Sequence, residues 1–383
     1  MSSLEEKNKA PKQEWAPRMW QGCILQAWLR LLVKNKLFIY PSKLYIGLNI
    51  TAVSTIHLGL RLLQQAWYGD VPSKTKIDKP PVFIIGHWRT GTTLMHELMI
   101  LDPRNTFPNT YHCLDPNHFL LTEEIFKKYF NFLLPTKRPM DNMEAGWDKP
   151  QEDEFALCMM GQPSPYLSVA FPNNPETDPD AFEIEKLHPK VKASWKKAFG
   201  RFLSEITFKD NRRLVLKSPT HTARIPTLLE MFPDARFIHI VRDPYVVYPS
   251  TVNLWKSLHR THGMQTPAFH GIEEKVLREF ELLYGCVERD KKLLAPNRFI
   301  EIRYEDLMQD PFSHMEQIYE KLELGDIGPL VPNLREYLDN RKDYKTNKYK
   351  SLKHRVVREI NERWGHVIDR YGYDRKDPEM CEV

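Results

Sequence analysis

The chain has 383 residues, of which 42% are hydrophobic and 27% charged, as is usual for a globular enzyme with a sizeable core. Its net charge of +5 is spread along the chain, whereas nucleic-acid-binding proteins usually concentrate basic residues in one stripe, so we expect no nucleic-acid partner. Five widely spaced cysteines indicate free thiols in a reducing compartment and fit neither a disulfide framework nor a zinc site.

The N-terminal region is expected to be helical. Residues 1–17 are polar and mixed in charge, which is typical of a disordered tail rather than a signal peptide. Apolar helices are predicted at 20–33 and 45–63, within a helical extension over 18–78. The second helix has no charged residue between Leu44 and Leu60 but carries polar residues there, and it falls short of the roughly 20 apolar residues that a membrane span needs. We therefore expect a hairpin over 20–65, packed on the rest of the chain or in peripheral contact with a membrane. The predicted location is cytoplasmic, with membrane association as the alternative.

The next stretch has the pattern of a buried strand, a tight turn and a helix. Val82–Ile85 is apolar and largely β-branched, as in a strand buried on both faces of a parallel sheet. Gly86 and Gly91 bracket four residues, and apolar residues at helical spacing follow. A turn of this kind presents backbone N–H groups and the positive end of a helix dipole to a phosphate.

The glycine spacing equals that of the nucleotide-triphosphate loop, Gly-x4-Gly-Lys-[Ser/Thr], but the chemistry differs. Thr92 occupies the position of the phosphate-gripping lysine, and the cation, Arg89, lies inside the loop. The stretch therefore predicts a phosphate site that does not handle a γ-phosphate. A P-loop nucleotide kinase or NTPase is the alternative; it would need a cation after Gly91 and a magnesium-binding acid, for which Asp243 is the candidate.

The rest of the chain alternates strands and helices. A second short strand is predicted at 106–111. Residues 138–180 are rich in proline and acids and read as a lid or acceptor-binding insertion, or else as a solvated connector. Further strands are predicted at 213–216, 236–241 and 298–303, and helices at 151–157, 181–208, 222–232, 244 onward, 272–294, 305–322 and 352–371. This alternation predicts an α/β domain over 79–375, with a mostly parallel central sheet flanked by helices.

A second phosphate-binding pattern follows the strand at 236–241. That strand delivers Arg242 at its carboxyl end, where α/β folds bind ligands. Ser250 follows eight residues later in the next helix, so one phosphate could receive both a guanidinium and a hydroxyl. The alternative is that Arg242 and Asp243 only cap the helix and that Ser250 is exposed.

Taken together, these two stretches resemble the sulfotransferases that use 3′-phosphoadenosine-5′-phosphosulfate (PAPS), from Pro81 to about Tyr371. The family pattern of the loop is Pro-[Arg/Lys]-[Ser/Thr]-Gly-Thr-Thr, and here Trp88 replaces the proline. Leu216–Pro219 and Arg303–Pro311 also match. The resemblance implies a P-loop-containing three-layer fold. It also implies in-line transfer of a sulfuryl group from PAPS to an acceptor hydroxyl, assisted by a general base and without a metal.

The resemblance also implies which residues contact PAPS. Arg242 and Ser250 would hold the 3′-phosphate, and Tyr304 would contact the adenosine. Lys217 would lie near the sulfuryl group, and Lys348 is our choice for a late basic residue at the phosphates, with a solvated charge run as the alternative. The loop residues expected at the 5′-phosphosulfate are Arg89, Thr90, Gly91, Thr92 and Thr93.

The general base is the least determined part of this prediction. Arg89 stands where the small-molecule cytosolic branch has lysine, so the chain looks closer to the tyrosylprotein, carbohydrate and bacterial branches. The cytosolic branch places a histidine base after the second strand, and the tyrosylprotein enzymes place a glutamate there. We expect His112 to be the base, with Asp115 and Glu154 as rivals; the predicted catalytic residues are His112, Arg89, Lys217 and Glu154.

Acceptor and oligomeric state stay open at this point. A carbohydrate, a lipid, a peptide tyrosine or a small alcohol would each supply the hydroxyl. A catalytically inactive, membrane-associated scaffold is the alternative outside enzymes, but the intact Arg89, Lys217, Arg242 and Ser250 argue against it.

Overall fold

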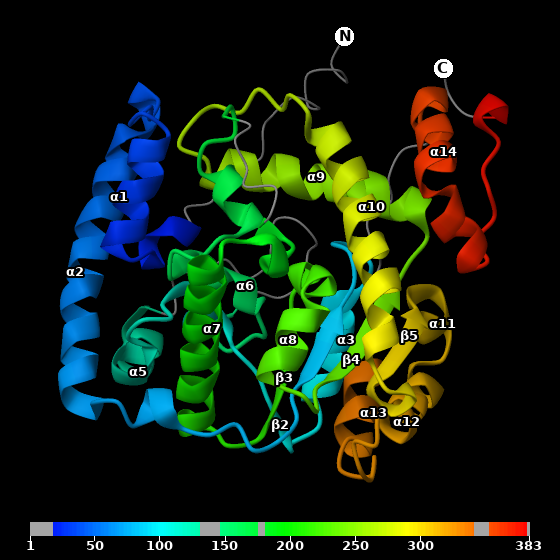
Figure 1. The fold of residues 1–383 in the computed structure, drawn as a ribbon, viewed down its shortest axis with the longest axis horizontal. Coiled ribbons are helices and arrows are strands. Elements are labelled where there is room, and N and C mark those ends of the chain that lie inside the picture. The colour runs from blue at the N-terminus through cyan, green and yellow to red at the C-terminus, as the bar shows by residue number, and fades with distance from the viewer. Residues whose placement is uncertain (1–17, 131–145, 175–180, 341–351, 381–383) are drawn as a thin grey trace.

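A central five-stranded parallel sheet organises the protein. The computed structural model describes residues 18–130, 146–174, 181–340 and 352–380 (Figure 1). Within these residues the strand order is β2-β3-β1-β4-β5. The strands are β1 (Val82–Ile85), β2 (Asn105–Thr106), β3 (Arg213–Lys217), β4 (Arg236–Val241) and β5 (Phe299–Arg303). Because β1 pairs with both β3 and β4, the predicted phosphate loop lies at the centre of the sheet's carboxyl edge.

Helices cover both faces of the sheet. The helices that follow β1 are α3 (Thr92–Ile100), α4 (Thr110–Leu114), α5 (Phe119–Phe130), α6 (Asp153–Met159), α7 (Pro189–Lys209), α8 (Ile225–Met231), α9 (Pro244–His262), α10 (Ile272–Asp290), α11 (Tyr304–Gln309), α12 (Pro311–Lys321), α13 (Val331–Asp339) and α14 (His354–Arg370). Successive side chains of β1 point to opposite faces. Phe83 packs into a core with α7 and α8, and Ile84 packs into a second core with α3, α12 and α13. The predicted three-layer α/β fold is confirmed.

The second strand is much shorter than predicted. The expected strand over 106–111 is wrong beyond Thr106, because β2 ends there and α4 begins at Thr110. Asn109 caps this helix: its side chain accepts a hydrogen bond of 2.8 Å from the backbone N–H of His112. His112 therefore lies inside a helix, not directly after a strand.

The N-terminal hairpin consists of α1 (Leu25–Lys34) and α2 (Leu44–Tyr68), which lie along one side of the molecule (Figure 1). Trp20 and Trp28 share a core with Trp88 of the phosphate loop, which joins the hairpin to the α/β domain. The predicted tail over 1–17 lies outside the described residues.

Helix α2 is longer than predicted and largely uncovered. By length and composition, Pro41–Tyr68 can cross a membrane, whereas the sequence argument placed it below that limit. Only 22% of its most apolar window is buried, so it is not a core helix. Large apolar side chains are exposed along the hairpin and the turn after it: Leu29, Val33, Leu37, Phe38, Leu44, Tyr45, Leu48, Ile56, Leu62, Leu63, Trp67 and Val71.

Candidate active site

The loop between β1 and α3 has the backbone of a phosphate cradle. Gly86 and Gly91 have positive φ values of 143° and 105°, which glycine adopts readily. A Cβ atom at Gly86 would lie 2.5 Å from the carbonyl oxygen of Ile240 in the neighbouring strand β4. Gly91 precedes Thr92 and Thr93, the first residues of α3, so the N–H groups of a helix N-terminus open onto this loop.

The predicted donor-site residues that follow β1, β4 and β5 converge around this loop. The Nε of Arg89 donates a hydrogen bond of 2.8 Å to the hydroxyl oxygen of Ser250, although the two residues are 161 positions apart. Arg242 donates to the carbonyl oxygen of Arg89 at 3.1 Å, and its guanidinium lies 4.2 Å from the centre of the Tyr304 ring. A Cβ atom at Gly91 would overlap the same ring, so Tyr304 lies directly against the loop.

Thr90 belongs to the loop for a structural reason as well. Its buried hydroxyl donates a hydrogen bond of 2.8 Å to the carbonyl oxygen of His87 and closes the turn. Arg89, just before it, has a φ of 71°, an uncommon value for a residue other than glycine. The turn thus aims the Arg89 side chain at the start of α9, where Ser250 is located.

Lys217 ends β3 and is paired with an acid that the sequence argument did not select. Its nearly buried Nζ donates a hydrogen bond of 2.8 Å to Oε1 of Glu152, the residue before α6. The hydroxyl of Tyr166 donates to the other oxygen of Glu152 at 2.5 Å, and the indole N–H of Trp88 donates to Tyr166 at 2.8 Å. Burial raises the pKa of Tyr166 well above its ordinary value, so the phenol keeps the proton that it donates.

This series of contacts connects the phosphate loop to the end of β3. Trp88 lies in the loop beside Arg89, and Glu152 contacts the predicted sulfuryl-binding Lys217. The side chain of Glu152 is 11% exposed, so its carboxylate is the one acid of the 151–154 stretch that both contacts a predicted site residue and keeps some access to solvent. Glu152 is therefore the acid of that stretch placed to act in the site.

Glu154, another predicted catalytic residue, has its carboxylate oxygens hydrogen-bonded to Arg224 and Thr220. It is fully buried, and Arg224 holds it with hydrogen bonds of 2.5 and 3.2 Å. Thr220 donates a further bond of 2.9 Å. The intervening acid, Asp153, is fully buried against His221.

His112, the expected base, has partners at both ring nitrogens. Its Nδ1 accepts a hydrogen bond from the backbone N–H of Asn109 at 3.3 Å, as part of the cap of α4. Its Nε2 lies 2.8 Å from Oε2 of Glu123. Burial lowers the pKa of His112, although the Glu123 carboxylate opposes that shift. The structure therefore gives His112 a place in the support of α4 and does not bring it into contact with Lys217 or the loop.

Asp115 and Lys348 are the remaining predicted residues. Asp115, the remaining rival for the base, ends α4 and faces His57 and His118 rather than Lys217. Lys348 lies outside the described residues. No sequence pattern marked Glu152 above its neighbours, because three acids stand in a row at 152–154 and only the fold shows which of them faces β3.

Comparisons with known proteins agree with this geometry. The model of the protein family described as "Sulfotransferase family" matches residues 80–326. A protein of Mycobacterium bovis (strain ATCC BAA-935 / AF2122/97), omega-hydroxy-beta-dihydromenaquinone-9 sulfotransferase Stf3, is 45% identical over 385 residues, which cover 100% of this chain and 98% of that protein. Mouse carbohydrate sulfotransferase 5 is 23% identical over 176 residues, or 41% of this chain and 42% of that protein. These bacterial and carbohydrate relatives agree with the prediction from Arg89 that the chain is closer to the tyrosylprotein, carbohydrate and bacterial branches than to the small-molecule cytosolic branch.

Solved structures show the same fold. Sulfotransferase STF9 from Mycobacterium avium superposes with a TM-score of 0.67 at 20% identity, over 88% of this chain and 87% of that chain. Sulfotransferase STF1 from Mycobacterium tuberculosis H37Rv superposes with a TM-score of 0.54 at 16% identity, over 82% and 85%.

Proposed function

Because the chain belongs to the sulfotransferase family, we propose that it transfers the sulfuryl group of PAPS to a hydroxyl of an apolar lipid. The convergence of Arg89, Ser250, Arg242 and Tyr304 on one loop carries this proposal, because it places two cations, a hydroxyl and an aromatic ring where a phosphorylated nucleotide would lie. The loop has Thr92 in place of the lysine that grips a γ-phosphate, which favours PAPS over a nucleoside triphosphate.

The donor would lie along the carboxyl edge of the sheet. Arg242 and Ser250 bind its 3′-phosphate, and Tyr304 contacts the adenosine. The N–H groups at Thr92 and Thr93 bind the 5′-phosphate side of the phosphosulfate. The remaining loop residues, Arg89, Thr90 and Gly91, complete this contact, and Lys348 stays our choice for a further contact to the phosphates.

Glu152 is the general base in this proposal, in place of His112. The acceptor hydroxyl gives its proton to Glu152 as its oxygen forms a bond to sulfur, and the bond from sulfur to the 5′-phosphate oxygen breaks. Lys217 and Arg89 stabilise the charge that develops on the leaving phosphate and on the sulfuryl oxygens. The pair of Lys217 with Glu152 links the two halves of the reaction, since one cation contacts the base and lies at a strand end beside the loop.

Two observations support a lipid as the acceptor: the exposed apolar surface of the hairpin and the name of one relative. The mycobacterial relative is named for a menaquinone derivative, a lipid with a hydroxyl group. The exposed apolar side chains between Leu29 and Val71 give this chain a surface that would lie on a membrane containing such a lipid. Residues 79–375 would form the catalytic domain, and the insertion at 138–180 would supply Glu152 and Tyr166 to the acceptor side.

Two measurements test the proposal. Calorimetric titration should show binding of 3′-phosphoadenosine-5′-phosphate (PAP) and none of ATP–Mg²⁺; the reverse order of affinity would support the kinase alternative. Transfer of labelled sulfate from PAPS should then be measured with a hydroxylated polyprenyl quinone in vesicles and, in parallel, with a carbohydrate, a tyrosine peptide and a small alcohol. Faster transfer to any of the last three would exclude the lipid as the preferred acceptor, and no transfer to any acceptor would favour an inactive scaffold.

A further inference from the structure

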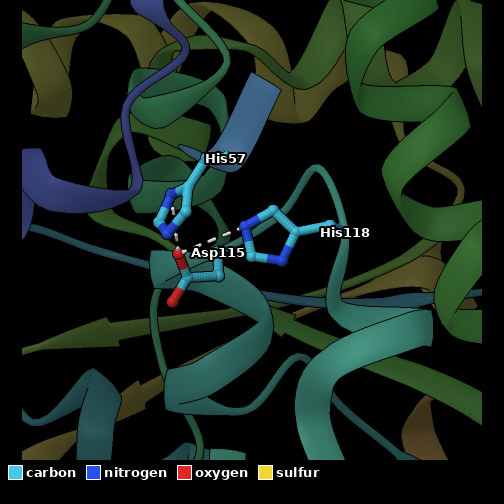
Figure 2. A group of neighbouring side chains, drawn as sticks. All are labelled: His57, Asp115 and His118. Carbon is cyan, nitrogen blue, oxygen red and sulfur yellow. Dashed lines mark ion pairs between the residues drawn. The ribbon is translucent and has the colours of Figure 1, made fainter. Parts of the chain in front are cut away.

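Three ligand-type side chains, one of them buried and two partly buried, meet at the junction of the hairpin and the α/β domain (Figure 2). His57 comes from α2, Asp115 ends α4, and His118 lies just before α5. Figure 2 shows both rings directed at one carboxylate oxygen, Oδ1 of Asp115. The three facing atoms, one from each residue, lie within 4.8 Å of one another. All three are inaccessible to solvent and have no hydrogen-bond partner among the described residues.

The distances within this group do not fit hydrogen bonds. Oδ1 of Asp115 lies 3.4 Å from Nδ1 of His57 and 3.7 Å from Nε2 of His118. Hydrogen bonds between nitrogen and oxygen are about 2.7–3.2 Å long. Ligand atoms around one tetrahedral zinc ion are about 3.3–3.6 Å apart, because the Zn–N and Zn–O bonds are about 2.0–2.2 Å long. The two separations from Oδ1 of Asp115 lie close to that range, and the two ring nitrogens lie within 4.8 Å of each other.

Thr122 orients the ring of His118. Nδ1 of His118 lies 2.9 Å from the hydroxyl oxygen of Thr122. That oxygen also lies 2.9 Å from the carbonyl oxygen of His118 and 2.8 Å from the hydroxyl oxygen of Tyr111. With Nδ1 donating to Thr122, Nε2 presents its lone pair toward Asp115. An outer hydrogen bond of this kind is typical of metal-binding histidines.

We propose that His57, Asp115 and His118 bind one divalent transition-metal ion, for which Zn²⁺ is the probe. Two imidazole nitrogens and one carboxylate oxygen suit a borderline ion of this class better than Mg²⁺ or Ca²⁺, which prefer oxygen ligands. Three protein ligands leave a position for water. The site is separate from the sulfuryl-transfer residues, and no step of that reaction passes through it.

The ion would fasten α2 to the α/β domain. Two neutral hydrogen bonds already join the end of α2 to α5: Gln64 accepts from the N–H of Leu121 at 3.3 Å, and Tyr68 donates to the carbonyl oxygen of Leu120 at 3.2 Å. His57 lies two and three turns before these residues on the same side of the helix. The metal site would hold the middle of α2 and leave the exposed apolar side chains facing outward.

The test uses the full-length protein after dialysis against a chelator and titration with Zn²⁺ alone. We expect one saturable Zn²⁺ per chain, a rise of a few degrees in the melting temperature (Tm) and, with Co²⁺, the visible absorption of a tetrahedral site. Asp115→Asn should abolish the stoichiometric binding. Thr122→Val keeps all three ligands and should weaken it by about 10–100-fold, since it removes the hydroxyl that contacts both His118 and Tyr111 and so orients the His118 ring. His270→Ala, at an exposed histidine far along the chain, should change nothing.

Thr122→Val keeps the test valid even if Asp115→Asn does not fold. Absence of saturable one-to-one binding by the wild-type protein would overturn the proposal. Equal affinity in wild type and either cluster variant would overturn it too, because the ion would then be bound elsewhere, and so would loss of binding in His270→Ala alone.

Discussion

The proposed site has a donor side, around Arg89 and Arg242, and an acceptor side, around Lys217 and Glu152. The cations of the two sides have different kinds of partner. On the donor side, Arg89 contacts a hydroxyl, and Arg242 contacts a backbone carbonyl and an aromatic ring. On the acceptor side, Lys217 contacts a carboxylate, and the neighbouring Glu154 is locked by Arg224. In the proposed site the donor-side cations would bind the anionic nucleotide, whereas on the acceptor side both charges of each ion pair belong to the protein.

This difference predicts whether a substitution should change ligand binding or the stability of the fold. In the proposed site, replacing a donor-side cation would remove a contact to the bound nucleotide. Removing one member of a buried acceptor-side pair leaves the opposite charge without a partner, which commonly costs about 3–5 kcal/mol. Binding defects and stability defects should therefore separate between the two sides, and the predictions below test that separation from the largest effect to the smallest.

The largest effect is expected for Glu152→Gln. Loss of a general base should lower kcat by about 10²–10⁴-fold, whereas KM for PAPS should change little, because Glu152 lies on the acceptor side. Steady-state kinetics with varied PAPS measures both quantities.

Two neighbouring variants serve as controls for that result. Glu154→Gln should lower the free energy of unfolding, measured by urea denaturation, while the folded enzyme keeps its kcat. His112→Ala should likewise keep kcat within a small factor. A large loss of kcat in His112→Ala together with near-normal activity of Glu152→Gln would return the role of base to His112.

The second effect is expected for Lys217→Met, at the junction of the two sides. Loss of a cation that stabilises the transition state should lower kcat by about 10²–10³-fold. Because Lys217 contacts Glu152, the double variant should lose less than the product of the two single losses. Independent, multiplicative losses would show that the pair does not act as a unit, and a change confined to KM would limit Lys217 to ground-state binding.

The two sides also differ in how well the sequence predicts them. The donor side can be predicted from the positions where strands end. Parallel strands bring their carboxyl ends to one edge of the sheet, so Arg89 after β1 and Arg242 after β4 had to lie close together. Ser250 followed from its fixed distance along α9. The pairing of the strands and the spacing along α9 determine where Arg89, Arg242 and Ser250 lie, so a short sequence motif is enough to predict their proximity.

The acceptor side depends on tertiary contacts that no local pattern records. Three consecutive acids occupy the N-cap and the first two positions of α6. Their different partners, Lys217, His221 and Arg224, come from segments more than 60 residues away. The cap of α4 by Asn109 shortened β2 and turned His112 inward. The sequence did not predict the proposed metal ligands for the same reason. His57 is far in sequence from Asp115 and His118, so the three residues form no local metal-binding motif.

A moderate effect is expected for Arg242→Ala on the donor side. A hydrogen bond to a charged group contributes about 1.5–3 kcal/mol, so affinity for PAP should fall by about 10–150-fold. Adenosine 5′-phosphosulfate, which lacks the 3′-phosphate, is the matched ligand, and its affinity should be unchanged. Calorimetry with both ligands makes the comparison, and equal losses would show that Arg242 does not bind the 3′-phosphate. Unfolding stability should stay near that of wild type, in contrast to Glu154→Gln.

The smallest effect is expected on the outer surface of the hairpin, which we propose contacts a membrane. Leu48 and Trp67 are 72% and 79% exposed, so replacing either with serine should leave Tm unchanged. Full burial of such a side chain contributes about 1.5–3 kcal/mol. Partial insertion into a membrane surface would contribute about 1 kcal/mol, which predicts roughly a fivefold loss of vesicle binding for each variant. Co-sedimentation with lipid vesicles measures this loss, and the rate with a soluble short-chain alcohol should not change. Leu293→Ser, at an exposed leucine in another part of the chain, is the matched control. Equal vesicle binding by wild type, Leu48→Ser and Trp67→Ser would mean that this apolar surface does not contact the membrane, and the lipid acceptor would then have to reach Glu152 by another route.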